Sequence, residues 1–397
     1  MNDAIFSPVT INAKTAVNRI VIQPVETNTA DKSGAPTQTT LSRYQSLAKG
    51  GAGLIHIESV DFVAESQART NRLLMNPDNL SKFRALVSAM RNENPDILII
   101  VQLSHGGGLG DSTLSDVVTV LPEGRSASRT LSVGEIDILK QTIVDAARMA
   151  REAGVDGIDF KQAHGFLGGE FIQPMNTRED QYGGSFENRT RFFRELMKQL
   201  RSELGPDFII GTRISPYEGI PGGFGTDGPD EVIESLAEPR KFARLCENSG
   251  CDFINVSAGH ASGNLEILMP TPGFPEGVFR HFGFTRQIKE AVTIPVIGSG
   301  YSYLRDGENN LPGDASRKSF SYFANKNIKD NNCDMVGIGR QSIADSAFPE
   351  KLEKGNEPDI HWCTACMGCG ILLGNHKKVG CVAYDEMYKK VFKSLEI

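Results

Sequence analysis

Eight short, almost wholly apolar segments recur along the chain, and their recurrence constrains the fold more than any other feature. They lie at residues 18–24, 53–59, 97–103, 157–160, 208–214, 253–257, 294–299 and 334–339. Stretches with helical periodicity separate them, the clearest being residues 132–153, where apolar side chains fall near a 3.6-residue period. Apolar runs without alternation are typical of parallel strands covered on both faces. Eight strand–helix units therefore predict an α/β chain that closes into a (β/α)8 TIM barrel.

An open doubly wound sheet is the alternative architecture, and it would carry a Gly-x-Gly-x-x-Gly turn after an early strand. The nearest run, the glycine-rich residues 106–110, is not followed by a helix in register. We therefore expect residues 1–350 to form one barrel. Residues 351–397 are expected to form a short, Cys-bearing C-terminal extension packed on that barrel.

Composition excludes several classes of protein. The 397 residues are 39% hydrophobic, enough for a large core, and the net charge of -7 without a basic block argues against nucleic-acid binding. The first residues lack the basic and apolar regions of a signal peptide, and no apolar run approaches membrane-spanning length. Seven cysteines, an odd number, with four of them after residue 362, favour a reducing cytoplasmic location over a disulfide framework.

Polar residues follow most of the predicted strands, where the carboxyl ends of barrel strands form the functional face. Small-residue turns follow the seventh and eighth strands, at residues 298–300 and 337–340, and the N–H groups of such turns can hold a phosphate. The Gln102 amide matches the donors and acceptors of a flavin pyrimidine. Arg213 can stabilise the negative charge that a flavin gains on reduction. These residues together predict a flavin site.

Five motifs link the chain to a known family. They are Asn18-Arg19-Ile20-Val21, Gln102-Leu103-Ser104-His105-Gly106-Gly107, Ala163-His164-Gly165-Phe166-Leu167, the loop from Asn176 to Arg189, and Val336-Gly337-Ile338-Gly339-Arg340. Together they resemble the Old Yellow Enzyme family of FMN-dependent NAD(P)H:flavin oxidoreductases, which includes dienoyl-CoA reductase-like barrels. The resemblance covers about residues 5–352, and the loop is its most specific part.

The resemblance implies a bound FMN that takes hydride from NAD(P)H and passes it to the β-carbon of an electron-poor alkene. It also implies which residues contact the cofactor. Pro24, Val25 and Ser59 would line the isoalloxazine, Gln102 would meet its pyrimidine, Arg213 would lie near N1 and O2, and Ser299, Gly300, Gly339 and Arg340 would hold the phosphate.

The substrate-binding positions depart from the family's pattern of His-x-x-His or His-x-x-Asn followed, two residues on, by Tyr. This chain has Lys161, His164 and Phe166 at those positions. We expect Lys161 and His164 to polarise a carbonyl, with Glu26 close to the flavin as a third catalytic candidate. Phe166 cannot donate a proton, so the proton would come from Lys161, water or another residue. The alternative is that Lys161 simply pairs with Glu26 or Glu58 and that His164 has a supporting role.

Four cysteines, Cys363, Cys366, Cys369 and Cys381, form a Cys-x2-Cys-x2-Cys-x11-Cys pattern near the end of the chain. Thiolates at such spacing can surround a soft ion or a cluster. Dienoyl-CoA reductase relatives carry a similar cluster-binding run with one more residue between the second and third cysteines. The four are therefore candidate ligands of an iron–sulfur cluster or of zinc. Reduced cysteines in a packed tail are the alternative.

The predicted function is NAD(P)H-dependent reduction of an enone- or enoate-like alkene by way of FMN. One alternative is a flavin-dependent dehydrogenase or demethylase that works in the oxidative direction. The other is a flavin-binding barrel without alkene reductase activity. The expected partners are a small-molecule substrate and a nicotinamide nucleotide, with neither nucleic acid nor membrane, and the sequence leaves a homo-oligomer open.

Overall fold

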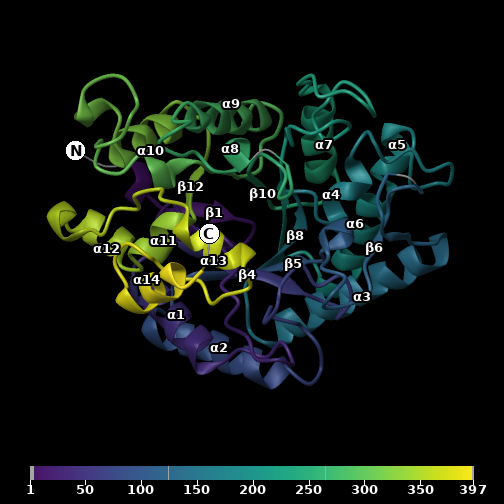
Figure 1. Ribbon diagram of the computed structural model, residues 1–397, viewed down its shortest axis with the longest axis horizontal. Helices are drawn as coiled ribbons and strands as arrows, with labels where there is room; N and C mark the ends of the chain where they lie inside the picture. The colour runs from purple at the N-terminus through teal and green to yellow at the C-terminus, as the bar shows by residue number, and fades with distance from the viewer. Residues whose placement is uncertain (1–3, 124, 264, 396–397) are drawn as a thin grey trace.

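Eight parallel strands close into a barrel in this computed structural model, which describes residues 4–123, 125–263 and 265–395 (Figure 1). The strands follow one another around the ring in chain order, and the last pairs with the first. They are β3 (Ile20–Ile22), β4 (Leu54–Asp61), β5 (Leu98–Ser104), β8 (Gly157–Gln162), β9 (Ile209–Ile214), β10 (Phe253–Val256), β11 (Val296–Gly298) and β12 (Met335–Ile338). All their residues are buried, as apolar runs covered on both sides require. The predicted (β/α)8 barrel is confirmed.

Helices surround the barrel and supply the crossover connections. The main ones are α1 (Gln38–Lys49), α2 (Leu80–Glu93), α3 (Val133–Glu152), α6 (Arg191–Leu204), α7 (Ala237–Asn248), α9 (Gly277–Lys289), α10 (Phe320–Lys329), α11 (Arg340–Ala344) and α12 (Phe348–Glu353). The short helices α4 (Leu167–Ile172), α5 (Phe186–Arg189) and α8 (Leu265–Leu268) lie in loops on the carboxyl side of the strands. A capping box starts α3, because the side chains of Ser132 and Glu135 satisfy each other's backbone N–H groups.

Two helices begin at different residues from those predicted. The sequence predicts mainly helix from residue 229, but residues 229–236 are irregular because their backbone bonds to the preceding loop. The N–H of Ser235 donates to the carbonyl of Gly225 at 2.8 Å. Helix α9 begins at Gly277 rather than at residue 284, and its glycines had weakened the helical signal.

A hairpin closes the amino end of the barrel. It consists of β1 (Val9–Ile11) and β2 (Lys14–Ala16), and Figure 1 shows β1 within the ring of barrel strands. Ile11 and Ala16 pack in one apolar cluster with residues of the barrel strands such as Leu54, Leu98 and Met335. No sequence signal had singled out this hairpin.

The C-terminal segment, with α13 (Gly368–Gly374) and α14 (Glu386–Lys393), packs against the carboxyl side of the barrel. The N–H of Val379 donates to the carbonyl of Thr27 at 2.9 Å, and the N–H of Cys363 donates to Gln341 Oε1 at 2.9 Å. Trp362 packs edge-on against Phe348 of α12, with ring centroids 5.4 Å apart. These contacts bring the segment to the strand ends.

Within the described ranges, no helix combines the length and the apolar character needed to cross a membrane.

The close contact between β9 and β10 gives a test of the barrel packing. A Cβ on Gly211 would lie 2.2 Å from Phe253 Cζ, so Gly211→Ala should lower the free energy of unfolding by about 1–3 kcal/mol. Gly134→Ala in α3 is the matched control, because nothing lies within 4 Å of its Cβ position. It should be neutral or stabilise by up to about 1 kcal/mol. Urea denaturation of both variants checks this, and equal effects would contradict the packing.

Candidate active site

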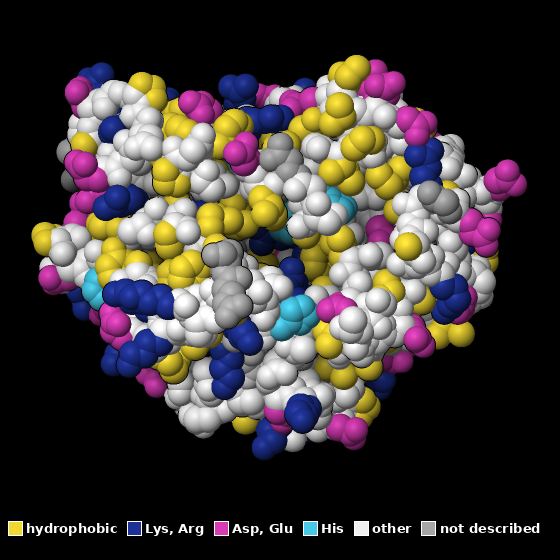
Figure 2. All heavy atoms as spheres, viewed as in Figure 1, with side chains coloured by type: hydrophobic (Ala, Val, Ile, Leu, Met, Phe, Trp, Pro, Cys, Tyr) yellow, Lys and Arg dark blue, Asp and Glu magenta, His cyan; other side chains and the backbone are white. Residues whose placement is uncertain are grey.

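A cavity of about 420 Å³ opens at the carboxyl end of the barrel, between the strand ends and the C-terminal segment. Figure 2 shows a hollow near the middle of this face, with Lys, Arg and His side chains visible inside it. The polar lining comes mainly from strand ends. Apolar lining comes from Leu268 and Met269 in and after α8, and from Ile371 and Leu373 in α13. The cavity is therefore polar on the barrel side and apolar toward the extension.

Gln23 ties together several strands at the base of the cavity. Its amide exchanges two hydrogen bonds with the Asn255 amide, at 2.7 and 3.0 Å, and accepts a third from Arg213 Nη1 at 2.9 Å. Arg213 Nη2 also donates to Ser257 Oγ at 3.2 Å. Burial lowers the pKa of Arg213 to about 10, which still leaves the guanidinium charged at neutral pH. A fixed cation therefore lies at the base of the cavity.

His164 follows β8 and has a φ of +65°, a left-handed conformation that is uncommon for a non-glycine residue. Its Nε2 lies 2.8 Å from Ser257 Oγ, and its N–H donates to Ser215 Oγ at 3.2 Å. Burial, followed by the charges of Arg213 and Lys161, lowers the pKa of His164 well below its usual value. The imidazole is therefore neutral at neutral pH.

Lys161, in β8, is a buried cation in the cavity wall. Its Nζ lies 3.1 Å from the centroid of the Phe166 ring, 3.4 Å from Ser59 Oγ and 3.6 Å from Glu26 Oε1. Burial lowers the pKa of Lys161 to about 7, although the Glu26 carboxylate opposes that shift. Lys161 thus pairs with Glu26, which was one of the alternatives drawn from the sequence. It also lines the cavity.

Two arginines from the loop after β4 complete a charged wall around Glu26. Arg69 Nη1 lies 2.5 Å from Glu26 Oε2, and Arg72 Nη1 lies 3.3 Å from the same oxygen. Arg72 also binds Asp61 with two nitrogens, at 2.5 and 2.8 Å. Burial alone would raise the pKa of Glu26, but the charges of Arg69, Arg72 and Lys161 outweigh it and lower that pKa strongly. Glu26 is therefore a carboxylate.

The structure brings most of the predicted site residues together. All three catalytic candidates line the cavity, as do the predicted cofactor residues Pro24, Val25, Arg213, Ser299, Gly300, Gly339 and Arg340. Ser59 and Gln102 instead lie behind its wall. Ser59 Oγ accepts from Lys161 and Arg72, and Gln102 Nε2 donates to Asp159 Oδ2 at 2.9 Å.

The cavity residues fit an FMN. Arg213 Nε is buried and has no hydrogen-bond partner among the described residues, so a donor is left for an electron-rich ligand edge. A Cβ on Gly300 would lie 2.9 Å from His281 Cβ, and one on Gly339 would lie 3.3 Å from Val25 Cγ2. The two turns thus have little room for side chains and leave their backbones open to a phosphate.

The four C-terminal cysteines, Cys363, Cys366, Cys369 and Cys381, line a second cavity of only about 20 Å³ beside the first. Burial raises the pKa of Cys363 and raises that of Cys369 to about 11, so both are thiols at neutral pH. In the described part of the chain, no group of three or more His, Cys, Asp or Glu side chains is arranged to hold a metal ion. An iron–sulfur or zinc site at these four cysteines stays a sequence prediction, and no step below uses it.

Sequence reasoning missed several residues of the cavity. Arg69, in a loop rather than at a strand end, lines the cavity, as do Leu268 and Met269 from a short helix and the residue after it. Arg72, in the same loop as Arg69, pairs with Glu26. Gln23 ends the first predicted strand, yet its sequence context did not distinguish it from Gln102. Its position at a strand end is the signal that could have marked Gln23 as a site residue, as it marked Lys161 and Arg213.

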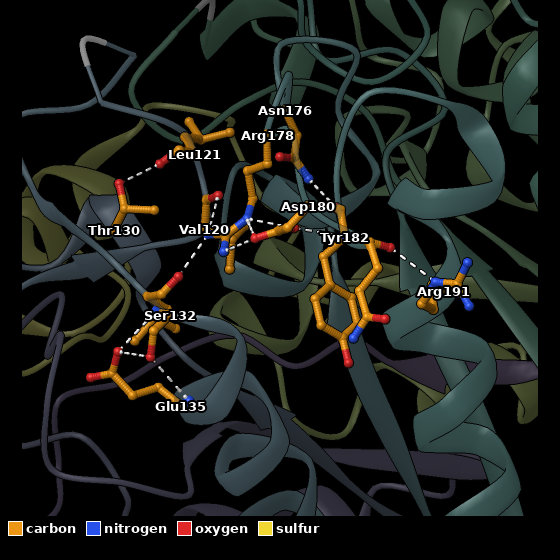
Figure 3. Close-up of polar contacts among 12 residues, drawn as sticks. Val120, Leu121, Thr130, Ser132, Glu135, Asn176, Arg178, Asp180, Tyr182 and Arg191 are labelled. Carbon is orange, nitrogen blue, oxygen red and sulfur yellow. Dashed lines mark hydrogen bonds and ion pairs between the residues drawn. The ribbon is translucent and has the colours of Figure 1, made fainter.

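Arg178 braces the long loop that carries the family resemblance (Figure 3). Its Nη1 donates to the carbonyls of Leu131 at 2.7 Å and Val120 at 3.2 Å, and its Nη2 pairs with Asp180 Oδ2 at 2.5 Å. The loop is thereby tied to the segment before α3, and its residues 176–189 are not among those that line the cavity.

The chain is similar to several known proteins. The pattern of the family described as NADH:flavin oxidoreductase / NADH oxidase matches residues 4–303. The NADH oxidase of Thermoanaerobacter brockii is 32% identical over 363 residues, which are 89% of this chain and 51% of that protein. The N,N-dimethylglycine/sarcosine dehydrogenase of Chromohalobacter salexigens is 29% identical over 92% of this chain and 51% of that protein. The chain thus spans about half the length of these curated relatives.

Solved structures show the same fold. A complex of 2-naphthoyl-CoA reductase with 2-naphthoyl-CoA superposes with a TM-score of 0.83 at 22% identity. The match covers 98% of this chain and 58% of that one.

The charged wall predicts a large effect of removing Arg72. Arg72→Met would leave Asp61 buried without its bidentate partner, and the free energy of unfolding should fall by about 3–5 kcal/mol at pH 7. The loss should shrink in acid, where Asp61 is protonated. The control Arg84→Met removes an exposed pair with Glu152 and should change stability by less than about 1 kcal/mol. Denaturant titrations of both variants at pH 7 and in acid measure these losses of stability. Equal losses for the two variants would contradict the pairing of Arg72 with Asp61.

Proposed function

Because this chain belongs to the NADH:flavin oxidoreductase / NADH oxidase family, we propose that it is an FMN-dependent oxidoreductase. It takes hydride from NAD(P)H and delivers it, by way of FMN, to an electron-poor alkene of the enone or enoate kind. The observation that carries the proposal is the cavity at the strand ends. There the buried Arg213 guanidinium, with its free Nε, lies in one lining with Lys161 and His164.

Pro24 and Val25 would line the ring of a bound FMN, and the turns that contain Gly300 and Gly339 would hold its phosphate. Ser299 and Arg340 complete the phosphate site. When bound, FMN supplies a hydride acceptor and donor in one ring system. Arg213 stabilises the ring edge that becomes negative on reduction, because a fixed cation in a dry site favours the anionic form.

Ser59 and Gln102 support this site from behind the wall. Ser59 Oγ accepts a hydrogen bond from Lys161 Nζ and another from Arg72, and so helps to position both cations. Gln102 donates a hydrogen bond to Asp159. Burial raises the pKa of Asp159 to about 6, and Asp159 lies on the Arg213 side of the barrel.

The proposed substrate binds over the flavin with its carbonyl oxygen toward Lys161 and His164. Lys161 offers an ammonium, and His164 offers an imidazole that Ser257 holds by Nε2. Donors of this kind favour the oxygen that gains negative charge during hydride addition. The apolar wall of Leu268 and Met269 suits the hydrocarbon part of such a substrate. NAD(P)H is proposed to use the same open face before the substrate does.

Anaerobic mixing in two steps tests the function. The protein reconstituted with FMN should turn yellow, NADH or NADPH should bleach it, and an enone such as cyclohexenone should restore the colour. A protein that cannot be reconstituted with FMN would overturn the proposal. Flavin bleached by the nucleotide but reoxidised by no enone would rule out alkene reduction. Flavin bleached by a secondary or tertiary amine would favour the oxidative direction instead, as in the dehydrogenase relative.

The role of Arg213 predicts a change in the flavin's reduction potential. Arg213→Met removes the buried cation and should lower the potential by about 60 mV, the equivalent of about 2.7 kcal/mol for a two-electron couple. Arg213→Lys keeps a positive charge and should lower it less. Spectroelectrochemical titration of the three proteins measures this. An unchanged potential in Arg213→Met would place the flavin ring away from Arg213.

A further inference from the structure

The proposed reaction needs an acid as well as a hydride, and the inference made here rests on the proposed function. Hydride addition to the β-carbon of an enone moves the π electrons toward the carbonyl and leaves an enolate. The enolate then has to take up a proton, at its oxygen or at its α-carbon, before a neutral product can leave. Either a group of the cavity wall or water must supply that proton.

Several groups of the wall cannot release a proton. Phe166 has no acidic hydrogen, and Glu26 is held as a carboxylate by the cations around it. The guanidinium groups of Arg69, Arg213 and Arg340 line the cavity, but arginine keeps its proton in proteins. None of these five residues can act as the acid.

The histidines and hydroxyls of the wall are too weakly acidic. Burial lowers the pKa of His281 to about 4, and burial with the nearby cations keeps His164 neutral as well. A neutral imidazole N–H is a far weaker acid than an imidazolium. The hydroxyls of Ser257 and Ser299 already take part in hydrogen bonds with their neighbours and are weaker acids than an ammonium.

Lys161 and Cys369 are the titratable wall residues that remain among those the structure describes, and only Lys161 lies on the strand-end side of the cavity, because Cys369 belongs to the C-terminal segment. Lys161 Nζ lies in the wall itself, over the face of Phe166 and 3.6 Å from Glu26, on the same strand-end segment as His164. We infer that Lys161 is the general acid of the reaction: its ammonium donates to the substrate's carbonyl oxygen and transfers that proton as the enolate forms.

The step balances within the groups named. The hydride forms the new C–H bond at the β-carbon, the C=C electrons shift to make the enolate double bond, and the C=O π pair moves to oxygen. The N–H bond of Lys161 breaks with its electrons left on nitrogen, and an O–H bond forms. The enol then becomes the ketone by exchange with water, the lysine amine regains a proton from water, and NAD(P)H remains the reductant.

The surroundings of Lys161 make its ammonium ready to release a proton. The charged groups that face it are Glu26 after β3, Arg69 and Arg72 in the loop after β4, Asp159 in β8 and Arg213 in β9. Burial opposes the charged form most, the three arginines oppose it further, and Glu26 favours it. The resulting pKa of about 7 lies near the operating pH, where general acids work best.

One test reads the protonation of Lys161 without turnover. Protein labelled with ¹³C at lysine Cε would be titrated by NMR, with and without FMN, and Lys161→Met would identify the Lys161 signal by its loss. An inflection near pH 7 is expected. Glu26→Gln should move the inflection to lower pH, because the Glu26 carboxylate favours the ammonium. A signal that shows no titration below about pH 9 would overturn the inference.

A second test follows reoxidation of the NAD(P)H-reduced flavin by an enone in a stopped-flow instrument. The wild-type rate should fall as the pH rises through the pKa of Lys161, because only the ammonium is competent. Lys161→Met should be slower by about 10²–10⁴-fold and lose this pH dependence. The matched control Lys198→Met changes an exposed lysine of α6 and should keep the wild-type rate and pH profile.

The outcomes separate this inference from the proposed function. Wild-type flavin that NAD(P)H reduces but no enone reoxidises would end the alkene-reductase proposal and this inference with it. Lys161→Met that is reoxidised at the wild-type rate, with the wild-type pH profile, would leave the function standing and show that Lys161 is not the acid.

Discussion

Closure of the parallel barrel is the constraint on which the other features depend. Because all eight strands run in one direction, their carboxyl ends meet at one mouth, and the β1–β2 hairpin fills the opposite end. Residues far apart in sequence therefore become direct neighbours there. Gln23 and Asn255 exchange amide hydrogen bonds, and Arg213 joins them from the neighbouring strand. This network holds the base of the cavity, so ligand chemistry can occur above it on a fixed frame.

The charged groups gathered at this mouth act together with burial on the pKa of Lys161. Arg72 is compensated by Asp61 through two short hydrogen bonds, and Arg69 by Glu26. Lys161 shares Glu26 with both arginines at a longer distance, and its side chain is buried. Burial of such a group favours the neutral amine. A histidine at this position would donate a hydrogen bond without holding a readily released proton, whereas lysine here does both.

Much of the fold could be predicted because apolar runs and helical periodicity are local signals. All eight barrel strands follow from them, but the β1–β2 hairpin does not, because its role depends on packing under the barrel. In the site, strand-end positions pointed to Lys161, His164 and Arg213. Arg69 and Arg72 could not be found this way, since the path of their loop is determined by tertiary contacts. Gln102 donates to Asp159, a neighbour visible only once β5 and β8 are paired, and its contact with a flavin stays a prediction.

The C-terminal segment is a structural part of the cavity. Arg340 is held between two elements: its Nη2 donates to the carbonyl of Pro270 at 2.6 Å, and its Nη1 contacts Met367 Sδ at 3.5 Å. Met367 and Cys369 border both the large cavity and the small cysteine-lined one. Met367 thus lies between the small cavity and Arg340 of the proposed phosphate site. Because α13 also supplies part of the apolar lining, we propose that the segment helps to hold the cofactor and to select substrates.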